Sequence, residues 1–506
     1  MHEQTEPPTR SITLTLKQVP EWVWPIVAAL VFFLVIFFFS TFRSEFQFNP
    51  DEGIELEKTL LMLRGYPLYD SIWNDQPPML TYILSVVFSL FRPDVNLGRI
   101  TVLVLSALLV LAAYGFLQMI WGHRIAWLGV LLLFFVPFYV QLSVSVMRGL
   151  PALTFVMLSL ASLTAWHTRR NKWWLVLSAV LMVVSVLIKL YTAAVIPVFM
   201  LGILIQAYLW NPDRHKWWQI LQPAVIWGSV FAVLLVILSL ILIRPANLYE
   251  VFWLPFTAAG EEFFDRGVRY TLESNLEGRP FFWLAALSLP YIVAARRWLT
   301  LYAVGWLGIA YVVLSNYRPV WYHQQLLMLI PAALLAAVAT GEALRILFRW
   351  QPGAKLITFG RLFSLLVLGV TGFTLFTSAS NPLQELQLGI DLQPQTLTTR
   401  DREYLFAPDV FATAQMYAPE ANMMLTDLPM YAFRLNLPVP PQTAVFSEKW
   451  FKTRYFSQND LIRFVEEYQP ELVLIGRFNL GKLENNLGDA YTLIAEQGQF
   501  RLYLRQ

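Results

Sequence analysis

Long apolar runs separated by short polar stretches dominate the first three quarters of the chain. The first run, 22–42, contains no charged residue. A helix needs about 20 apolar residues to cross the hydrocarbon core of a membrane. The pattern therefore predicts membrane-spanning helices, the shortest being 77–91, at 22–42, 77–91, 100–120, 125–142, 150–166, 173–188, 190–209, 219–243, 281–295, 299–315, 325–343 and 362–379.

Basic residues in the connections predict which side of the membrane each loop occupies, because loops rich in Arg and Lys stay in the cytoplasm. Such clusters lie at 169–172, 214–216, 296–297 and 345–361. This topology places the N-terminus in the cytoplasm and puts outside the segments 43–76, 244–280, 316–324 and everything after 380. Between 92 and 169, however, the predicted segments give an odd number of crossings where an even number is required. Eleven or thirteen crossings satisfy the topology, and twelve do not.

After residue 380 the chain changes character. It carries 15 acidic and 11 basic residues there, a net charge of −4, and no long apolar run. Short apolar stretches alternate with amphipathic ones, which predicts a helix at 459–468 and strands at 423–427, 472–475, 491–496 and 500–504. The predicted fold class is a polytopic all-α membrane protein of about 11–13 helices, with a membrane domain over 1–379 and a small extracytoplasmic α/β domain over 380–506.

Composition supports a membrane protein and narrows its chemistry. The chain is 57% hydrophobic with a mean hydropathy of +0.52, and 14% of its residues are charged, against roughly 25% in a soluble protein. Without cysteine it has no disulfide, thiolate metal site or cysteine nucleophile. The net charge of +3 is small and the basic residues lie between apolar runs, so no nucleic-acid partner is expected. The first run is too long for a signal peptide and is expected to be a retained helix.

The first outside loop begins with a charged stretch, FNPDEGIELEK, at 48–58. Asn49 suits a helix N-cap and Pro50 suits the first helical position, so 50–64 is predicted to be a short helix lying in the membrane interface. Glu55 and Glu57 are interpreted as its solvated face.

Two acids of this loop are open to two interpretations. Asp51 lies in the first turn of the predicted helix, where a carboxylate stabilises the helix dipole. Asp75 lies two residues before Pro77-Pro78, at the entry to the segment 77–91. Each is either only a helix cap or a functional acid.

The order of several motifs resembles that of the GT-C membrane glycosyltransferases, which use polyprenyl-phosphate sugars and include the protein O-mannosyltransferases and the aminoarabinose transferase of lipid A. The motifs are the outside loop with Asp51-Glu52-Gly53, Asp75-x-Pro-Pro, the Lys of LIKLYTAAVIPVF (187–199), the Tyr-His of WYHQQLLMLIPAALLAA (321–337), and ANMMLTDLPMYAFRLNLPVPPQ (421–442). Two positions depart from the family pattern. Gln76 stands where Lys or His is common, and Arg148 is followed by Gly-Leu-Pro without an acid.

The resemblance implies an inverting transfer of a sugar from a polyprenyl phosphate to an acceptor hydroxyl at the outer membrane face. Phosphate is already a good leaving group, so the reaction needs a base more than an acid. By resemblance Asp51 is that base, and Asp75 positions the acceptor, shares a divalent cation or tunes Asp51. Glu52 and Tyr322 are expected as secondary contacts to the acceptor. No cofactor is assigned beyond the lipid-linked donor, although Asp51 and Asp75 together could bind a divalent cation.

The leaving phosphate requires cations, and a set of basic residues in or near the predicted outside loops are the candidates to bind it. They are Lys189, Arg148, Arg318, His323, Arg266 and Arg269. All except Arg148 have a plainer interpretation: Lys189 as a lysine that reaches to the interface from a helix end, Arg318 and His323 as loop solvation, and the pair at 266 and 269 as a surface salt-bridge cluster.

The expected partners are a lipid-linked sugar donor, membrane lipids, and a lipid, glycan or protein acceptor. The expected location is the plasma (inner) membrane, with many spans. A transporter or flippase is the alternative from another class. Such proteins place polar residues at the bilayer midplane and in repeated halves, whereas this chain has no repeat and gathers its ionisable residues at one face.

Overall fold

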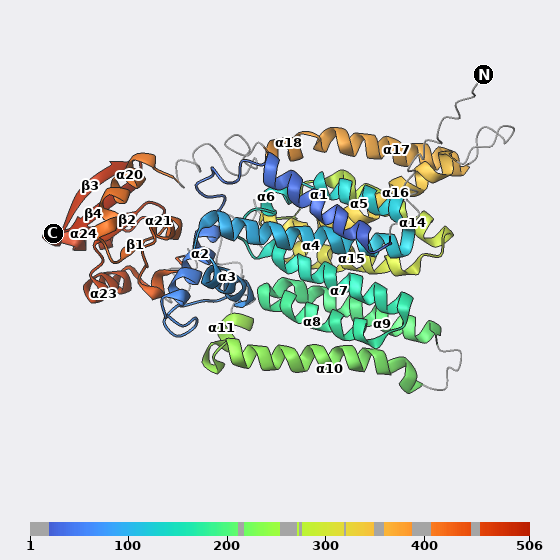
Figure 1. The fold of residues 1–506 in the computed structure, drawn as a ribbon, viewed down its shortest axis with the longest axis horizontal. Coiled ribbons are helices and arrows are strands. Elements are labelled where there is room, and N and C mark those ends of the chain that lie inside the picture. Colours follow the sequence, from blue (N-terminus) through green and yellow to red (C-terminus); the bar gives the residue numbers. More distant parts are fainter. Residues whose placement is uncertain are drawn as a thin grey trace, which may run out of the picture.

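The structure is a computed structural model that describes residues 20–210, 217–253, 271–272, 276–317, 320–348, 359–386, 406–446 and 456–506. Long apolar helices form one bundle, and a small α/β unit lies at one of its ends (Figure 1). The long helices of the bundle are α1 (Val23–Phe39), α4 (Val95–Trp121), α5 (His123–Phe134), α7 (Gly149–Arg169), α8 (Lys172–Ile188), α9 (Ile196–Trp210), α10 (Trp217–Leu242), α14 (Arg279–Ala294), α15 (Leu301–Asn316), α16 (Leu326–Phe348) and α17 (Phe359–Ser378).

Burial divides these helices into a centre and a rim. Every residue of α16 from Leu326 to Ala343 is buried, so this helix forms the centre of the bundle. Helices α10 and α17 instead expose large apolar side chains such as Ile241 and Phe376. Apolar rim helices of this kind are suited to contact with lipid.

Short elements cap the bundle at the end next to the α/β unit. They are α2 (Pro50–Leu63), α3 (Met79–Leu90), α6 (Tyr139–Leu142), α11 (Leu248–Phe252) and α18 (Ser380–Leu386), together with the 3₁₀ helices η2 (Leu190–Val195), η3 (Pro245–Asn247) and η6 (Tyr322–Gln325). A further 3₁₀ helix, η5 (Trp298–Thr300), lies at the opposite end, where Trp121 at the end of α4 donates to Thr300. The segment predicted as one helix over 125–142 is therefore divided into α5 and α6. Phe138, between them, has a left-handed backbone with φ 64°.

Helix α3 does not cross the bundle. Near its start, Thr81 Oγ1 donates to Glu55 Oε2 of α2 at 3.2 Å, and near its end Phe88 stacks on Phe433 of the α/β unit. Both ends of α3 therefore lie at the same end of the bundle. Among the described residues, seven helices are long and apolar enough to span a membrane, and five shorter apolar helices accompany them. Without α3, eleven of these twelve helices remain as candidate crossings. Eleven is one of the two numbers that the predicted topology allows, so the prediction of 77–91 as a crossing is corrected.

The α/β unit contains a four-stranded sheet with strand order β1-β2-β4-β3. Its strands are β1 (Met424–Thr426), β2 (Leu472–Ile475), β3 (Tyr491–Gln497) and β4 (Phe500–Arg505), and β1 and β2 are parallel while the other pairs are antiparallel. Its helices are α20 (Pro408–Tyr417), η7 (Ala418–Glu420), α21 (Pro429–Leu435), η8 (Pro441–Thr443), α23 (Gln458–Tyr468), α24 (Gly481–Leu487) and η9 (Gly488–Ala490). The four strands and the helix predicted for this part of the chain are confirmed.

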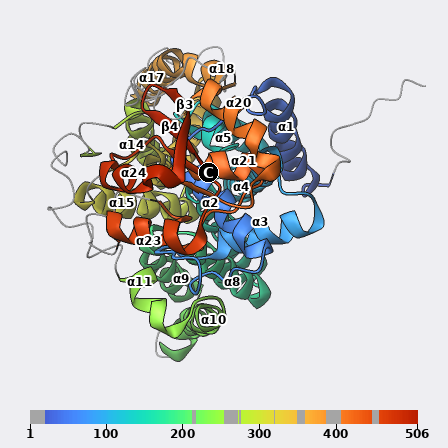
Figure 2. The same cartoon turned by 90° about the vertical axis from the view of Figure 1, so that its left-hand side faces the viewer.

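Helix α2 is enclosed between the bundle and the α/β unit (Figures 1 and 2). The helix predicted at 50–64 is confirmed, but its predicted solvated face is wrong. Glu55 and Glu57 are 1% and 0% exposed, because α2 packs on α3 along one side and on α21 of the α/β unit along another. Protein therefore surrounds this helix, and its predicted placement in the membrane interface stays a prediction.

Candidate active site

Asp51 lies at the exposed N-terminus of α2. Asn49 caps the helix, since its Oδ1 accepts a hydrogen bond of 3.0 Å from the backbone N–H of Asp51. The Asn49 amide also donates to the hydroxyl of Tyr322, at 3.3 Å. The Asp51 carboxylate itself is exposed and makes no hydrogen bond or ion pair with the described residues. It is therefore available to a substrate.

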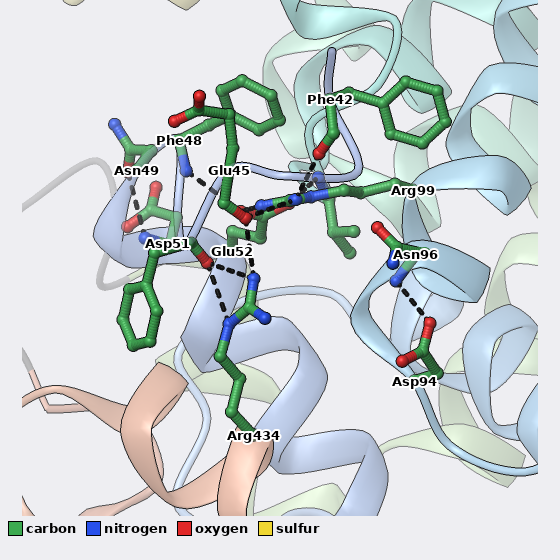
Figure 3. Close-up of polar contacts among 12 residues, drawn as sticks. Phe42, Glu45, Phe48, Asn49, Asp51, Glu52, Asp94, Asn96, Arg99 and Arg434 are labelled. Atoms are coloured by element: carbon green, nitrogen blue, oxygen red, sulfur yellow. Dashed lines mark hydrogen bonds and ion pairs between the residues drawn. The ribbon is translucent and has the colours of Figure 1, made fainter. Parts of the chain in front are cut away.

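Glu52, the next residue, has a different environment (Figure 3). Its two carboxylate oxygens accept from Nε and Nη2 of Arg99 at 2.9 and 2.8 Å, and both side chains are fully buried. The same carboxylate accepts from the backbone N–H groups of Phe48 and Val146. With both oxygens engaged, Glu52 joins the first loop to α4 and to the segment before α7. Its predicted acceptor contact stays a prediction, and this geometry favours a structural role.

Glu55 is the centre of a buried polar cluster. Its Oε1 accepts from Lys58 Nζ at 3.0 Å and from Arg148 Nε at 2.5 Å. Burial alone would raise the pKa of Glu55, but the positive charges of Arg148 and Lys58 lower it below its usual value. Burial lowers the pKa of Lys58 to about 8, against the opposing attraction of Glu55. The Glu55 carboxylate thus contacts two cations, Lys58 and Arg148.

Arg148 is only partly satisfied by this cluster. Its Nη1 atom is buried and has no hydrogen-bond partner among the described residues. A buried, unsatisfied guanidinium nitrogen is costly unless a ligand fills it. Arg148 therefore points to an anion site beside Glu55.

Asp75 belongs to the same polar region. It is 5% exposed, and its charge acts on Lys58, on Tyr69 and on Tyr317. Its neighbour Asn74 accepts from Lys58 Nζ at 3.4 Å through Oδ1. The two predicted acids thus act on different cations, Asp75 on Lys58 and Asp51 on Lys189.

Lys189 reaches the site from the break between α8 and η2. Its Nζ lies 5.1 Å from the centre of the Tyr191 ring. It interacts electrostatically with Asp51, Glu55 and Arg148. The positive charge of Lys189 also acts on His323 of η6, which is buried and whose Nδ1 has no partner within the described part of the chain.

The structure therefore unites five predicted site residues from distant parts of the sequence, namely Asp51, Arg148, Lys189, Tyr322 and His323. Arg266, Arg269 and Arg318 lie outside the described residues. For the predicted divalent cation, the described residues contain no group of three or more acidic or histidine side chains that could hold a metal ion.

Sequence reasoning missed Lys58, Arg99 and Arg434. Arg99 could have been identified from the sequence, because it is a lone charge at the start of a long apolar run, where charged residues are usually functional or paired. Lys58 was hidden, because a Glu-Lys pair three residues apart is common on exposed helices.

Comparison with known proteins supports the fold independently. Residues 75–243 match the family model described as dolichyl-phosphate-mannose-protein mannosyltransferase. Among curated proteins, none matches the chain by sequence. The fold is similar to crystal structures of ArnT from Cupriavidus metallidurans, bound to undecaprenyl phosphate or in the apo state, with TM-scores of 0.57 and 0.58. Both comparisons have 16% identity and cover 95% of this chain and 97% of that one.

A second similar structure is the archaeal oligosaccharyltransferase AglB from Archaeoglobus fulgidus, in complex with an inhibitory peptide and a dolichol-phosphate. Its TM-score is 0.52 with 11% identity, over 89% of this chain and 69% of that one. The predicted resemblance to GT-C glycosyltransferases and the predicted helical fold with a small C-terminal α/β domain are thereby confirmed. The extracytoplasmic placement of that domain stays a prediction. The comparisons indicate a multi-pass membrane protein of this type.

Proposed function

We propose that this protein is an inverting glycosyltransferase. It moves a sugar from a polyprenyl-phosphate donor to an acceptor hydroxyl at the outer face of the membrane. The observation that carries the proposal is one exposed carboxylate, Asp51, close to cations that include an unsatisfied guanidinium nitrogen of Arg148. ArnT, whose fold this chain shares, binds undecaprenyl phosphate, which supports a lipid phosphate as the ligand.

In the proposed reaction Asp51 takes the proton from the acceptor hydroxyl. The hydroxyl oxygen attacks the anomeric carbon from the face opposite the phosphate, so the new bond forms with inversion. The bond between the anomeric carbon and the phosphate oxygen breaks, and the electron pair leaves with the lipid phosphate. A carboxylate positioned in this way typically contributes about 10²–10⁴-fold to the rate.

Arg148 and Lys189 are proposed to hold the departing phosphate, with Tyr322 and His323 beside them. Cationic donors stabilise the charge that develops on phosphate oxygens, and they act most strongly in a site from which water is excluded. Arg266, Arg269 and Arg318 complete the proposed set. Asp75, next to Lys58, is proposed to orient the acceptor.

The arrangement of the bundle supports an outer-face site. Arg148 contacts α2 at the start of α7, and the 21 residues of that helix lead to the basic cluster at Arg169, about 30 Å away. Basic clusters mark the cytoplasmic side, so α2 and the α/β unit are proposed to lie outside. The polar cluster therefore lies at one end of the helices. A transporter would instead place its polar residues near the middle of the helices.

The first prediction tests the base. In purified full-length protein, Asp51→Asn is expected to lower kcat for transfer from a lipid-phosphate sugar by at least about 100-fold, because the amide cannot accept the proton. Binding of undecaprenyl phosphate is expected to change little.

Asp94→Asn is the matched control. Asp94 is also an acid at a helix N-terminus at the same end of the bundle, where it caps α4 (Figure 3). Its replacement is expected to leave transfer within about threefold of wild type. Transfer by Asp51→Asn at the wild-type rate in folded protein would refute the assignment.

A further inference from the structure

The segment that leads from α1 into the first turn of α2 is held by two arginines from different parts of the chain (Figure 3). Arg99 of α4 donates through Nη1 to the carbonyl oxygens of Phe42 and Glu45, at 2.6 and 2.8 Å. Arg434 of α21 donates through Nη2 to the carbonyl oxygens of Glu45 and Phe46, both at 2.7 Å, and through Nε to the latter at 3.1 Å. The carbonyl of Glu45 is therefore shared between the bundle and the α/β unit.

The side chain of Phe46 strengthens this attachment. Its ring stacks on Phe406 with a centroid distance of 4.2 Å and meets the rings of Tyr431 and Phe411 edge-on at 4.9 and 5.2 Å. The guanidinium carbon of Arg434 lies 4.8 Å from the same ring centre. Phe46 is thus an anchor of the first loop within the aromatic side chains of the α/β unit.

Helix α21 also packs tightly on α2 itself. A Cβ atom on Gly53 would lie 2.5 Å from the backbone nitrogen of Met430, so the two backbones are in direct contact there. Gly53 is two residues after Asp51. The α/β unit therefore constrains the turn that carries Asp51 from two sides, through the loop before it and through the helix after it.

We infer that Arg434 is a positioning residue for Asp51, and that the α/β unit completes the active site by fixing the loop that precedes the base. This inference rests on the proposed function. The Asp51 carboxylate has no partner among the described residues, so its place is determined by the backbone of 42–51 and by the Asn49 cap. Loss of Arg434 removes the donors to the Phe46 carbonyl and one of two donors to the Glu45 carbonyl.

The expected consequence is a loss of rate without a loss of donor binding. A displacement of about 1 Å in a reacting group can lower the rate by about 100-fold. Among the described residues, Arg148 bonds to Glu55 and Lys189 lies against Tyr191, and neither makes a hydrogen bond or ion pair with Arg434. The affinity for the lipid phosphate is therefore expected to change less than twofold.

The test compares Arg434→Gln with Arg64→Gln in the full-length protein. Arg64 also joins α2 to the α/β unit, since its guanidinium donates to the carbonyl oxygen of Asn436, but it lies at the other end of α2 from Asp51. Three quantities are measured: kcat and KM for sugar transfer, the Kd for undecaprenyl phosphate, and amide hydrogen exchange in peptides that cover 42–52.

Arg434→Gln is expected to lower kcat at least tenfold, to leave Kd within twofold, and to speed exchange in 42–52. Arg64→Gln is expected to leave all three near wild type, and Arg434→Lys, which can still donate to both carbonyls, is expected to recover part of kcat. Equal loss of kcat in both glutamine variants, or unchanged exchange in Arg434→Gln, would overturn the inference. If Arg434→Gln does not fold, Phe46→Leu tests the same attachment, and wild-type exchange and kcat in that variant would also overturn it.

The two proposals fail in distinguishable ways. If the wild-type protein transfers no sugar from a lipid phosphate but Arg434→Gln still speeds exchange in 42–52, the proposed function fails and the positioning of the loop stands. If the wild type is active and both kcat and exchange are unaffected by Arg434→Gln, the proposed function stands and the positioning fails.

Discussion

Four carboxylates of α2 lie within seven residues but have four different environments. Asp51 is exposed, Glu52 is paired with Arg99, Glu55 contacts two cations, and Glu57 is buried and accepts a hydrogen bond from a backbone N–H. The sequence singles out Asp51 through its position in the first turn and its match to a family motif. It could not separate Glu55 and Glu57 from an ordinary solvated face, because their burial depends on Met430 and Val439, more than 370 residues later.

Glu57 predicts a dependence of stability on pH. Its Oε1 accepts from the Val439 N–H at 3.1 Å, its Oε2 has no partner among the described residues, and burial raises its pKa from about 4.5 to about 8. Between these values the unfolded chain releases the proton and the folded protein keeps it, so this group lowers stability as pH rises from about 4.5 to 8.

Glu57→Gln removes the titrating carboxyl, and with it the loss of stability between about pH 4.5 and 8, while keeping the shape of the side chain. It is expected to raise Tm at pH 8 by roughly 1–3 °C relative to wild type, with a much smaller difference at pH 5. Thermal unfolding at both pH values provides the measurement. Glu466→Gln, on an exposed position of α23, serves as the control and is expected to shift Tm by less than half a degree or so. A stabilisation that is the same at both pH values would contradict this account.

The ion pair of Glu52 and Arg99 predicts a strong coupling between the two side chains. Arg99→Met leaves a buried carboxylate without its cation, which typically costs about 3–5 kcal/mol of stability. Adding Glu52→Gln to that variant removes the unpaired charge and is expected to recover part of the loss. A double-mutant cycle by chemical unfolding measures the coupling, and strictly additive effects would mean that the pair is not formed.

At the scale of the elements, the apolar pattern predicts most of the helices to within about six residues, since length and hydropathy alone define a span. The exception is the run 125–142, where α5 already ends at Phe134. The pattern could not tell that the segment 77–91 folds back. The 12 residues of α3 cover only about 18 Å, which is short of the hydrocarbon core, but α5 also has 12 residues, so length alone does not separate the two. The contacts of α3 with Glu55 and with Phe433, which are distant in sequence, show that both of its ends lie at the same end of the bundle.

The side of the membrane on which residue 92 lies tests whether α3 folds back. The chain has no native cysteine, so an introduced cysteine is the single thiol that a maleimide can label. With α3 folded back, Arg92→Cys is expected to react with a membrane-impermeant maleimide in intact cells. Arg170→Cys, at the exposed end of α7, is expected to react only after the membrane is opened. Protection of residue 92 in intact cells, together with labelling after permeabilisation, would show that α3 is a full crossing.

At the scale of the whole molecule, the apolar helical bundle and the more polar C-terminal α/β unit meet at the proposed site. The sequence predicts that the first loop and the C-terminal α/β unit lie on the same side of the membrane. It does not predict that α21 covers α2, because this contact depends on backbone complementarity at Gly53 and on arginine donors to carbonyl groups, which leave no periodic pattern. The residues that carry the proposed chemistry were largely predictable, whereas those that hold them in place were not.

The shared carbonyl of Glu45 has a consequence for how the protein is made. Its two donors belong to helices that leave the ribosome at very different times, since Arg99 follows soon after the loop while Arg434 is separated from it by 389 residues. The membrane helices can therefore be inserted and packed around the loop well before α21 exists. On the inference drawn above, a nascent or prematurely terminated chain has the donor-binding cations but an unfixed base. Synthesis of the last hundred residues would then act as the step that switches the enzyme on.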